Sequence, residues 1–302
     1  MCPWRHDSVE IIMKAGPAVA ARKKTLSHSS SNQPSFPLLY SIGFRFVHTK
    51  TLPANTLWYE NQKESFMNFL IYGEDCRHAI LSALLTEAGF VTQAPADLLI
   101  LSPKESFSTH TDEIKKECLI WGGPASDIPL LQEAGYRKIK QRDAFRVKNS
   151  VYTAEGALAL AIAETKTALC ESMVSVLGYG YLGKECARLF SAVGAAVTVY
   201  TENPTELMQA SQDGFRANKL TELSALDGRL LLNTIPSPVL DRLPVFAKKA
   251  PALLMELASI PCTTKELDGV RVVPAGALPS RFSPESAAKL MFEEIMYQLK
   301  KE

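Results

Sequence analysis

A glycine-rich turn between a strand and a helix constrains the fold of this 302-residue chain more than any other feature. The apolar run 173–177 is followed at once by the residues Gly178-Tyr179-Gly180-Tyr181-Leu182-Gly183. A helical pattern then covers 184–193, and a second apolar strand pattern follows at 196–200. The spacing G-x-G-x-x-G in a strand–turn–helix–strand context is typical of βαβ units that bind dinucleotides.

Each glycine has its own expected role in such a turn. Gly178 permits the tight turn, Gly180 lets the backbone approach a pyrophosphate, and Gly183 lets the helix pack closely on the strand. Tyr181 and Leu182 open the helix, where free N–H groups and a partial positive charge favour a phosphate. The sequence therefore predicts a dinucleotide site, and the alternative is a purely structural turn without a ligand.

Other candidate cofactor residues follow the predicted strands at their carboxyl ends, where ligands bind in open α/β sheets. They are Thr201, Glu202, Asn233, Thr234, Pro236, Ser259 and Gly276. An acid after the second strand holds the ribose 2′-hydroxyl of NAD, whereas an arginine accommodates the 2′-phosphate of NADP. Because Glu202 stands there and no arginine adjoins it, the sequence favours NAD over NADP as the cofactor.

Strand and helix patterns alternate from Met67 to the end of the chain, which predicts an α/β protein. The expected fold is a Rossmann-type doubly wound parallel sheet with a smaller N-terminal α/β domain, closed by a C-terminal helix. The predicted parts are a substrate-side α/β domain (67–150), a linking helix (151–170), a dinucleotide-binding domain (171–280) and a C-terminal helix (281–302). Thr153 is expected to cap the linking helix, which we place at a cleft.

The first 66 residues differ from the rest of the chain in charge and in pattern. They hold eight Lys or Arg against four Asp or Glu, and they show no sustained hydrophobic period. We interpret them as a non-native extension that precedes a native start at Met67, and a targeting peptide is the alternative. In either case we expect this segment to be disordered.

The overall composition excludes several classes of protein. Lys and Arg (33) balance Asp and Glu (32), so no broad basic surface for nucleic acid is expected. No apolar run reaches the roughly 20 residues that span a bilayer. The six cysteines include no C-x-x-C pair, which favours free thiols in a reducing cytoplasm over a disulfide framework or a metal site.

Four further segments surround the glycine turn in a recognisable order. They read NSVYTAEGAL (149–158), LNTIP (232–236), LASIP (257–261) and PAGALPSR (274–281), and Ser283-Pro284 follows. Together with the turn they resemble the family of dipicolinate synthase A subunits over nearly all of 67–302. The resemblance covers none of residues 1–66, in agreement with a start at Met67.

The chain departs from the usual residues of that family at four places. It has Tyr152 for a proline, Cys262-Thr263 for two glycines, Ser280-Arg281 for glycine-lysine, and Glu202 for a frequent arginine. The first two changes affect loop shape, and the third retains a cation. The fourth puts the use of NADP in doubt.

The resemblance implies an oxidoreductase subunit that oxidises dihydrodipicolinate to dipicolinate (pyridine-2,6-dicarboxylate) with NAD(P)⁺ during spore formation. It also implies an oligomer with a second, flavoprotein-like subunit. A dicarboxylate site needs cations, hydroxyls or helix N-termini. The candidates for substrate binding are Asn149, Ser150, Thr153 and Arg281, and the candidates for catalysis are Arg281 and, as a proton acceptor, Glu155.

Two other functions remain open from the sequence. An NAD-dependent 2-hydroxyacid dehydrogenase shares the expected layout, but such enzymes use a histidine oriented by a carboxylate. All five histidines precede the glycine turn, so carbonyl reduction would need another proton donor. The second alternative is a nucleotide-binding partner subunit with no chemistry of its own.

Overall fold

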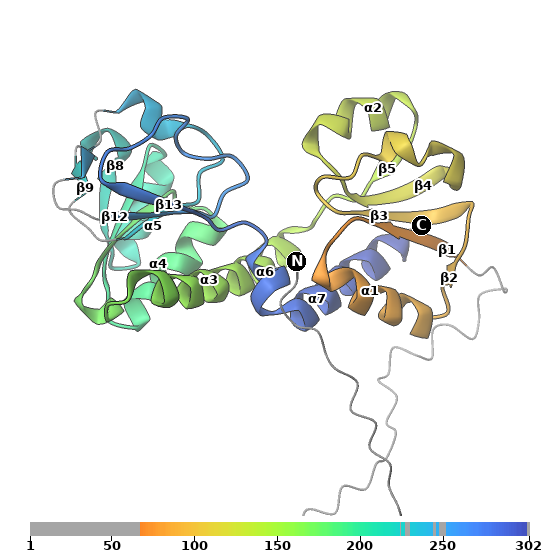
Figure 1. Ribbon diagram of the computed structural model, residues 1–302, viewed down its shortest axis with the longest axis horizontal. Helices are drawn as coiled ribbons and strands as arrows, with labels where there is room; N and C mark the ends of the chain where they lie inside the picture. The colour runs from red at the N-terminus through yellow and green to blue at the C-terminus, as the bar shows by residue number, and fades with distance from the viewer. Residues whose placement is uncertain (1–66, 224, 227–229, 244–245, 248–251, 301–302) are drawn as a thin grey trace, which may run out of the picture. The chain divides into compact units, whose positions relative to one another are not determined.

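The computed structural model describes residues 67–302 except 224, 227–229, 244–245, 248–251 and 301–302 (Figure 1). The predicted N-terminal extension, 1–66, therefore lies outside the described residues. None of the helices in the described part combines the length and the apolar composition that are needed to cross a membrane.

The first part of the described chain forms a five-stranded parallel sheet in the order β2-β1-β3-β4-β5. Its strands are β1 (Asn68–Tyr72), β2 (Val91–Thr92), β3 (Ala96–Leu101), β4 (Ile114–Gly122) and β5 (Arg137–Lys138). Helix α1 (Cys76–Glu87) connects β1 to β2, and α2 (Ile128–Glu133) connects β4 to β5. This is the flavodoxin-like order of doubly wound sheets, in which the winding reverses between β1 and β3.

The second part forms a six-stranded parallel sheet in the order β13-β12-β10-β6-β7-β8. Its strands are β6 (Met173–Leu177), β7 (Ala196–Thr201), β8 (Arg216–Lys219), β10 (Leu230–Asn233), β12 (Ala252–Glu256) and β13 (Val270–Pro274). Read from β8, the order in the chain is 3-2-1-4-5-6, which is the Rossmann order. The predicted fold class is therefore confirmed.

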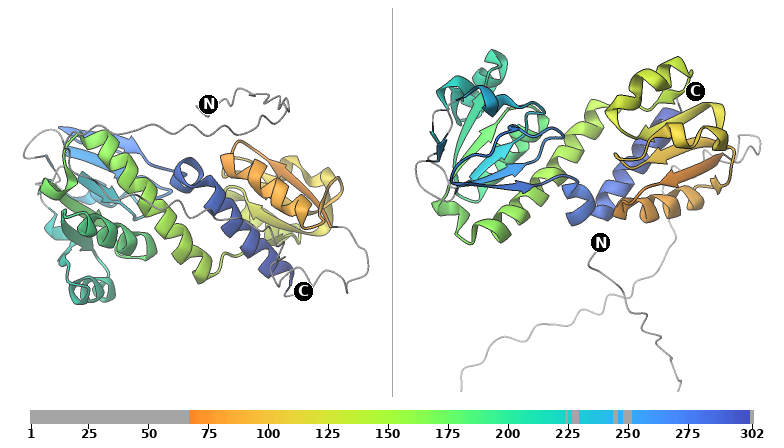
Figure 2. Two further views of the ribbon diagram at one scale, coloured as in Figure 1. Left: turned by 90° about the horizontal axis from the view of Figure 1, so that it is seen from below. Right: turned by 45° about the horizontal axis from the view of Figure 1, so that its top comes forward.

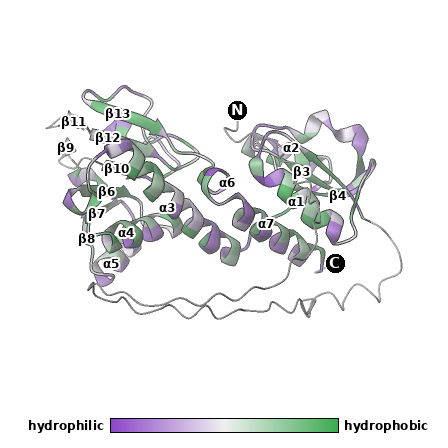
Figure 3. Cartoon of the chain, turned by 60° about the horizontal axis from the view of Figure 1, so that its bottom comes forward, coloured by the Kyte–Doolittle hydropathy of each residue, from purple (hydrophilic) through white to green (hydrophobic). Residues whose placement is uncertain are grey.

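Helices α4 (Tyr181–Ala192) and α5 (Pro204–Gln212) connect the first three strands of the second sheet. Two short strands, β9 (Ala225–Leu226) and β11 (Phe246–Ala247), pair separately in parallel. The strands are rich in hydrophobic residues, whereas the helices alternate between hydrophobic and hydrophilic residues (Figure 3). This is the pattern expected when helices cover a parallel sheet with their apolar faces.

The linking helix is longer than the sequence predicts. Helix α3 (Asp143–Thr165) begins before the expected start, so Thr153 lies inside it and does not cap it. The Thr153 hydroxyl donates instead to the backbone oxygen of Asn149 at 2.7 Å. Because a threonine inside a helix can satisfy its hydroxyl on the preceding turn, its presence does not fix a helix start.

The C-terminal segment contains two helices, α6 (Leu278–Phe282) and α7 (Pro284–Leu299). Helix α7 packs beside α1 (Figures 1 and 2). Its buried residues Ala288, Leu290, Met291 and Ile295 join the core of the first sheet. A buried carboxylate, Glu294, ties α7 to the start of α3, because it accepts from Arg142 Nε at 2.8 Å and from Arg142 N at 3.2 Å.

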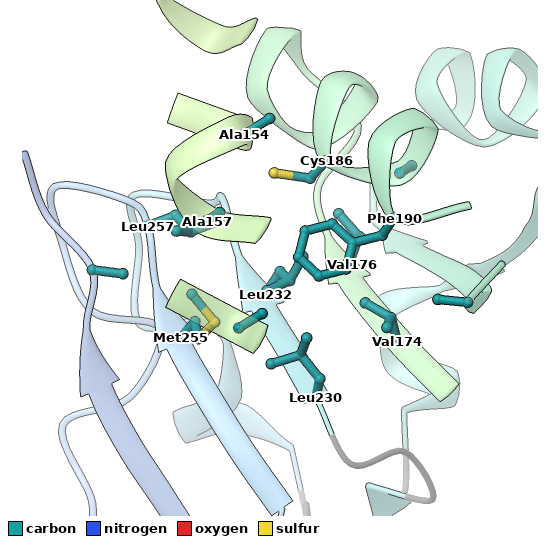
Figure 4. Packing of buried hydrophobic residues seen from close by; sticks show 14 of the residues in the cluster. Ala154, Ala157, Val174, Val176, Cys186, Phe190, Leu230, Leu232, Met255 and Leu257 are labelled. Atoms are coloured by element: carbon teal, nitrogen blue, oxygen red, sulfur yellow. The ribbon is translucent and has the colours of Figure 1, made fainter. Parts of the chain in front are cut away.

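Helix α3 contributes to both hydrophobic cores. Phe145, near its start, belongs to the core of the first sheet. Ala154, Ala157, Leu160 and Ala161 belong to the core of the second sheet. In Figure 4, Ala154 and Ala157 face the α4 residues Cys186 and Phe190 and the strand residues around Leu232. The two sheets therefore share one structural helix.

Candidate functional site

The glycine turn follows β6, next to the point where the winding of the second sheet reverses. A Cβ atom on Gly178, which has a φ of +87°, would lie 2.9 Å from Thr234 Oγ1. A Cβ on Gly183 would lie 2.2 Å from the backbone oxygen of Gly178. Both glycines are therefore required by the packing of the protein itself.

Gly180 has no such packing requirement. A Cβ at this position would meet no atom within 4 Å among the described residues, and its φ is −71°, which any residue can adopt. The residue is also exposed. The open space in front of Gly180 is where a dinucleotide-binding turn places the pyrophosphate, so the turn fits such a ligand.

The start of α4 is suited to bind an anion. Gly180 occupies the N-cap position, no side chain caps the helix, and its first turn holds no acidic residue. The first N–H groups of a helix lack partners within the helix and carry a partial positive charge. Tyr181 and Leu182, predicted as cofactor residues, open this helix and supply such N–H groups.

Glu206, in the first turn of α5, fixes the glycine turn to the end of β7. Its Oε2 accepts from the backbone N–H of Tyr179 at 2.9 Å and from the Thr201 hydroxyl at 2.6 Å. The buried Thr201 side chain therefore helps to hold the turn, and its predicted cofactor contact stays a prediction. Glu202 is exposed directly after β7, so its predicted ribose contact stays a prediction.

Asn233, at the end of β10, is fully buried, and both ends of its side chain are used inside the protein. Its Nδ2 donates to Glu256 Oε2 at 2.6 Å, and its Oδ1 accepts from the N–H of Ile235 at 3.0 Å. Asn233 therefore positions the loop after β10, and its predicted ribose contact stays a prediction.

Glu256, at the end of β12, is a buried carboxylate that the sequence analysis missed. Its Oε1 accepts from the backbone N–H of Cys262 at 3.0 Å and from the Cys262 thiol at 3.1 Å. Burial raises the pKa of the Cys262 thiol, and the hydrogen bond to the Glu256 carboxylate and its negative charge raise it further. Glu256 therefore joins the loops that follow β10 and β12 at the carboxyl edge of the sheet.

The remaining predicted cofactor residues lie at the same carboxyl edge. Thr234 donates its hydroxyl to the backbone oxygen of Leu177 at 2.6 Å, which braces the start of the glycine turn. Pro236, Ser259 and Gly276 are exposed after β10, β12 and β13. Their contacts with a cofactor stay predictions.

A cavity of about 720 Å³ opens at the carboxyl ends of β1, β3 and β4 in the first sheet. Its lining combines apolar side chains such as Trp121 and Leu131 with the backbone of Gly122 and Gly123. The charged side chains of the lining are Asp75, Arg77, Lys138, Lys140, Asp143 and Arg146. Four cations thus face two carboxylates, so the cavity favours an anionic ligand.

Asp75 caps α1, as its position before the helix suggests, and also orders the cavity wall. Its carboxylate accepts from Arg77 N and Arg77 Nε, both at 2.9 Å, and from the Ser280 hydroxyl of α6 at 2.8 Å. Burial opposes the ionisation of Asp75, but the hydrogen bonds and charge of Arg77 outweigh it and lower its pKa from 3.8 to about 2. The buried ion pair therefore holds Arg77 in one orientation.

His78, next to Arg77, also lines the cavity. Its Nδ1 lies 3.2 Å from the backbone oxygen of Gly73, and burial lowers its pKa below the ordinary value of 6.5. The ring is therefore mainly neutral at pH 7. Asp143, which also belongs to the lining, raises the pKa of Tyr181, the first residue of α4, through a hydrogen bond.

The structure brings one of the predicted substrate residues to the cavity. Asn149 lines it, whereas Ser150 and Thr153 are buried inside α3 and do not. Glu155 is exposed further along α3, outside the cavity lining. Arg281 is exposed on α6, with its guanidinium carbon 5.3 Å from the Phe282 ring centroid, also outside the lining. The predictions for helix-capping donors were wrong, because α3 begins at Asp143.

One family model matches the dinucleotide-binding part, and two curated relatives match longer stretches of the chain. Residues 150–238 match the family described as "S-adenosyl-L-homocysteine hydrolase, NAD binding domain". Adenosylhomocysteinase of Aeropyrum pernix is 26% identical over 165 residues, covering 51% of this chain and 38% of that protein. The A subunit of dipicolinate synthase from Bacillus subtilis is 30% identical over 193 residues, covering 60% of this chain and 65% of that protein.

The chain is similar to the A subunit of dipicolinate synthase. The match to this curated relative spans just under two thirds of the relative's length. The crystal structure of the corresponding subunit from Bacillus halodurans shares the fold, with a TM-score of 0.63 and 20% identity over 77% of this chain and 97% of that one. The dipicolinate synthase A chain from Bacillus subtilis gives a TM-score of 0.62 with 24% identity over 78% and 97%.

A transhydrogenase from Sinorhizobium meliloti shares the fold more distantly, with a TM-score of 0.51 and 15% identity over 78% of this chain and 92% of that one. These similarities show an NAD-binding, oxidoreductase-like fold related to the A subunit of dipicolinate synthase and to adenosylhomocysteinase. They support a nicotinamide cofactor and leave the choice between NAD and NADP to experiment.

Proposed function

We propose that the chain is an oxidoreductase subunit that oxidises dihydrodipicolinate to dipicolinate with NAD(P)⁺. The observation that carries the cofactor half of this proposal is the open space in front of Gly180, in a turn whose other two glycines are required by packing. The similarity to the A subunit of dipicolinate synthase supports the substrate half.

The residues of this chain bind and orient the reactants. The first N–H groups of α4 are suited to bind the diphosphate, and Glu202 to accept from a ribose hydroxyl. The buried Glu256 and Asn233 keep the loops after β10 and β12 in place beside the cofactor. NAD(P)⁺ held there would supply the hydride acceptor for the dihydropyridine ring, which would lose one hydride and one proton on becoming aromatic.

The acid at position 202 favours NAD, because a carboxylate would repel the 2′-phosphate of NADP. The proposal includes a second, flavoprotein-like subunit in a cytoplasmic oligomer that acts during spore formation. The resemblance to the family of dipicolinate synthase A subunits supports these features.

The test is a spectrophotometric assay of dipicolinate formation from dihydrodipicolinate generated in situ. NAD⁺ and NADP⁺ are compared, with and without the candidate partner subunit. We expect dipicolinate and reduced nicotinamide to form in equal amounts, with NAD⁺ preferred. Absence of product under all four conditions, with intact cofactor binding, contradicts the proposed reaction.

A 2-hydroxyacid dehydrogenase-like reaction is the second candidate, because the structure places a histidine in the cavity. The negative charge of Asp75 acts on the His78 ring and favours its protonation, and carbonyl-reducing enzymes use a histidine as the acid–base group. Oxidation of NADH by a panel of 2-oxo acids would favour this candidate. Cofactor binding without turnover of either substrate class would instead favour a non-catalytic nucleotide-binding subunit.

A further inference from the structure

We infer that the cavity of the first sheet is a binding site for a planar, dianionic dicarboxylate, and that Arg77 is the cation that binds one of its carboxylates. The inference rests on the proposed function only in taking that dicarboxylate to be the substrate. The site itself follows from topology, charge and side-chain geometry.

Topology places a ligand site here. In doubly wound sheets, ligands bind outside the carboxyl ends of the strands at the point where the winding reverses. In the first sheet that point lies between β1 and β3. The cavity is lined by the start of α1 after β1 (the N-cap Asp75 and Arg77), by the end of β3 (Leu101) and by the end of β4 (Gly122). It is therefore the counterpart, in the first sheet, of the glycine turn in the second.

Charge selects the class of ligand. The excess of cations over carboxylates in the lining is two, with His78 mainly neutral at pH 7. A dicarboxylate carries two negative charges, so its charge matches that excess. The apolar walls, which include Trp121 and Leu131, suit the faces of a planar ring.

Geometry selects Arg77 among the cations. Its Nε and Nη2 atoms donate to Asp75, and no hydrogen bond engages Nη1 among the described residues. One side of the guanidinium is thus fixed and the other is available to a carboxylate. The Arg77 side chain is only 18% exposed, and Asp75 is held in turn by Ser280. A pre-oriented, largely buried guanidinium binds a carboxylate with little loss of side-chain entropy.

The second carboxylate of the ligand has candidates on α3. Arg146 and Asn149 both line the cavity and stand three residues apart in the helix, so they share a face. Arg146 is 57% exposed and lies 4.0 Å from Asp143, so its guanidinium is less constrained than that of Arg77. We therefore expect Arg77 to contribute more of the affinity.

The test measures the binding of three probes to the full chain by titration calorimetry. They are pyridine-2,6-dicarboxylate, benzene-1,3-dicarboxylate, which has the same carboxylate spacing without the metal-chelating ring nitrogen, and benzoate. Arg77→Gln should weaken both dicarboxylates about 10- to 100-fold, as the loss of a charge-assisted hydrogen-bonded pair implies. Benzoate binding should change less, and NAD⁺ affinity should be unchanged.

Arg188→Gln is the matched control, since Arg188 is an exposed arginine of α4 that pairs only with Glu185 among the described residues. It should leave dicarboxylate affinity unchanged. Asp75→Asn tests the positioning role of Asp75. It should lower the affinity for dicarboxylates less than Arg77→Gln does, and it should reduce the ratio of dicarboxylate affinity to benzoate affinity.

Dicarboxylate affinity that is equal in the wild type and in Arg77→Gln, with both proteins folded by circular dichroism, overturns the inference. Absence of dicarboxylate binding by the wild type also overturns it. If the probes bind through Arg77 but dihydrodipicolinate is not oxidised, the site stands and the proposed reaction fails. If oxidation proceeds with an unchanged KM in Arg77→Gln, the reaction stands and this site fails.

Discussion

At the scale of single residues, the glycines of the turn differ in purpose: some are required by the packing of the fold, and one is explained only by a ligand. Gly183 is required because a Cβ would lie 2.2 Å from a backbone oxygen, whereas Gly180 meets nothing within 4 Å. A pair of alanine substitutions can therefore distinguish a binding turn from a purely structural one.

We expect Gly180→Ala to leave the melting temperature unchanged or slightly higher, because its φ of −71° suits alanine and the unfolded chain loses freedom. NAD⁺ affinity should fall about 10-fold or more, as overpacking of about 1–3 kcal/mol at the diphosphate implies. Gly183→Ala should instead destabilise the fold by at least that amount. Calorimetric titration and thermal unfolding of both variants check this, and unaltered NAD⁺ binding in Gly180→Ala would favour a structural turn.

The buried carboxylate of Glu256 gives a second residue-scale prediction. All of the groups that hydrogen-bond to its carboxylate are donors. In Glu256→Gln, the side-chain NH₂ group would therefore face another donor, and both buried groups would lose a hydrogen bond. We expect the free energy of unfolding to fall by about 1–3 kcal/mol, measured by urea denaturation. Glu222→Gln, at an exposed site, should change it by less than about 0.5 kcal/mol.

The sequence located the glycine turn because its three glycines and their flanking strand and helix are contiguous. It assigned Asn233 and Thr201 to the cofactor because both follow strands, but their partners Glu256 and Glu206 come from other elements. Such pairings depend on how strands and helices meet, so a local pattern does not contain them. Asp75 and Arg77 stand two positions apart in the sequence, but their shared place in the wall of a cavity appears only in the fold.

At the scale of secondary-structure elements, the end of a strand was predictable where an apolar run stops at a glycine. Strand β6 was placed at its observed limits, since it is an apolar run that glycine follows directly. Strand β8 and helix α6 were missed. The sequence RANK of β8 lacks an apolar pattern, because an edge strand is only partly covered. Helix α6 is too short to show a period.

The link between α1 and α6 through Asp75 predicts a pH dependence. The pKa of Asp75 is about 2 in the folded protein and 3.8 ordinarily, so folding favours its charged form. Its contribution to stability is therefore present above about pH 4 and is lost as the pH falls from about 4 to about 2.

We accordingly expect the stability advantage of the wild type over Asp75→Asn to shrink across this window in urea unfolding curves recorded at successive pH values. The other carboxyl groups titrate in both proteins and cancel in the difference. An advantage that stays constant from pH 5 to pH 2 would show that the Asp75 carboxylate is not stabilised by Arg77 and Ser280 in solution.

At the scale of the whole molecule, α3 is the element through which the two sheets depend on each other. Phe145 packs in the first core and Ala157 in the second, and both belong to one helix. Loss of the second core would remove the tertiary packing of the C-terminal half of α3, and helices of this kind depend on such packing. We therefore expect the two cores to unfold in one transition.

Trp121 reports on the first core, because it is buried there against Phe145, with ring centroids 5.3 Å apart. Replacing Trp4 and Trp58 with phenylalanine leaves it as the single tryptophan of the chain. In that background, Leu232→Ala truncates a fully buried residue of the second core, at a cost of about 2–5 kcal/mol. If α3 couples the cores, the urea midpoint seen by Trp121 fluorescence falls together with the midpoint seen by circular dichroism. If Trp121 keeps its original midpoint while the circular dichroism splits into two steps, the cores unfold independently and α3 does not couple them.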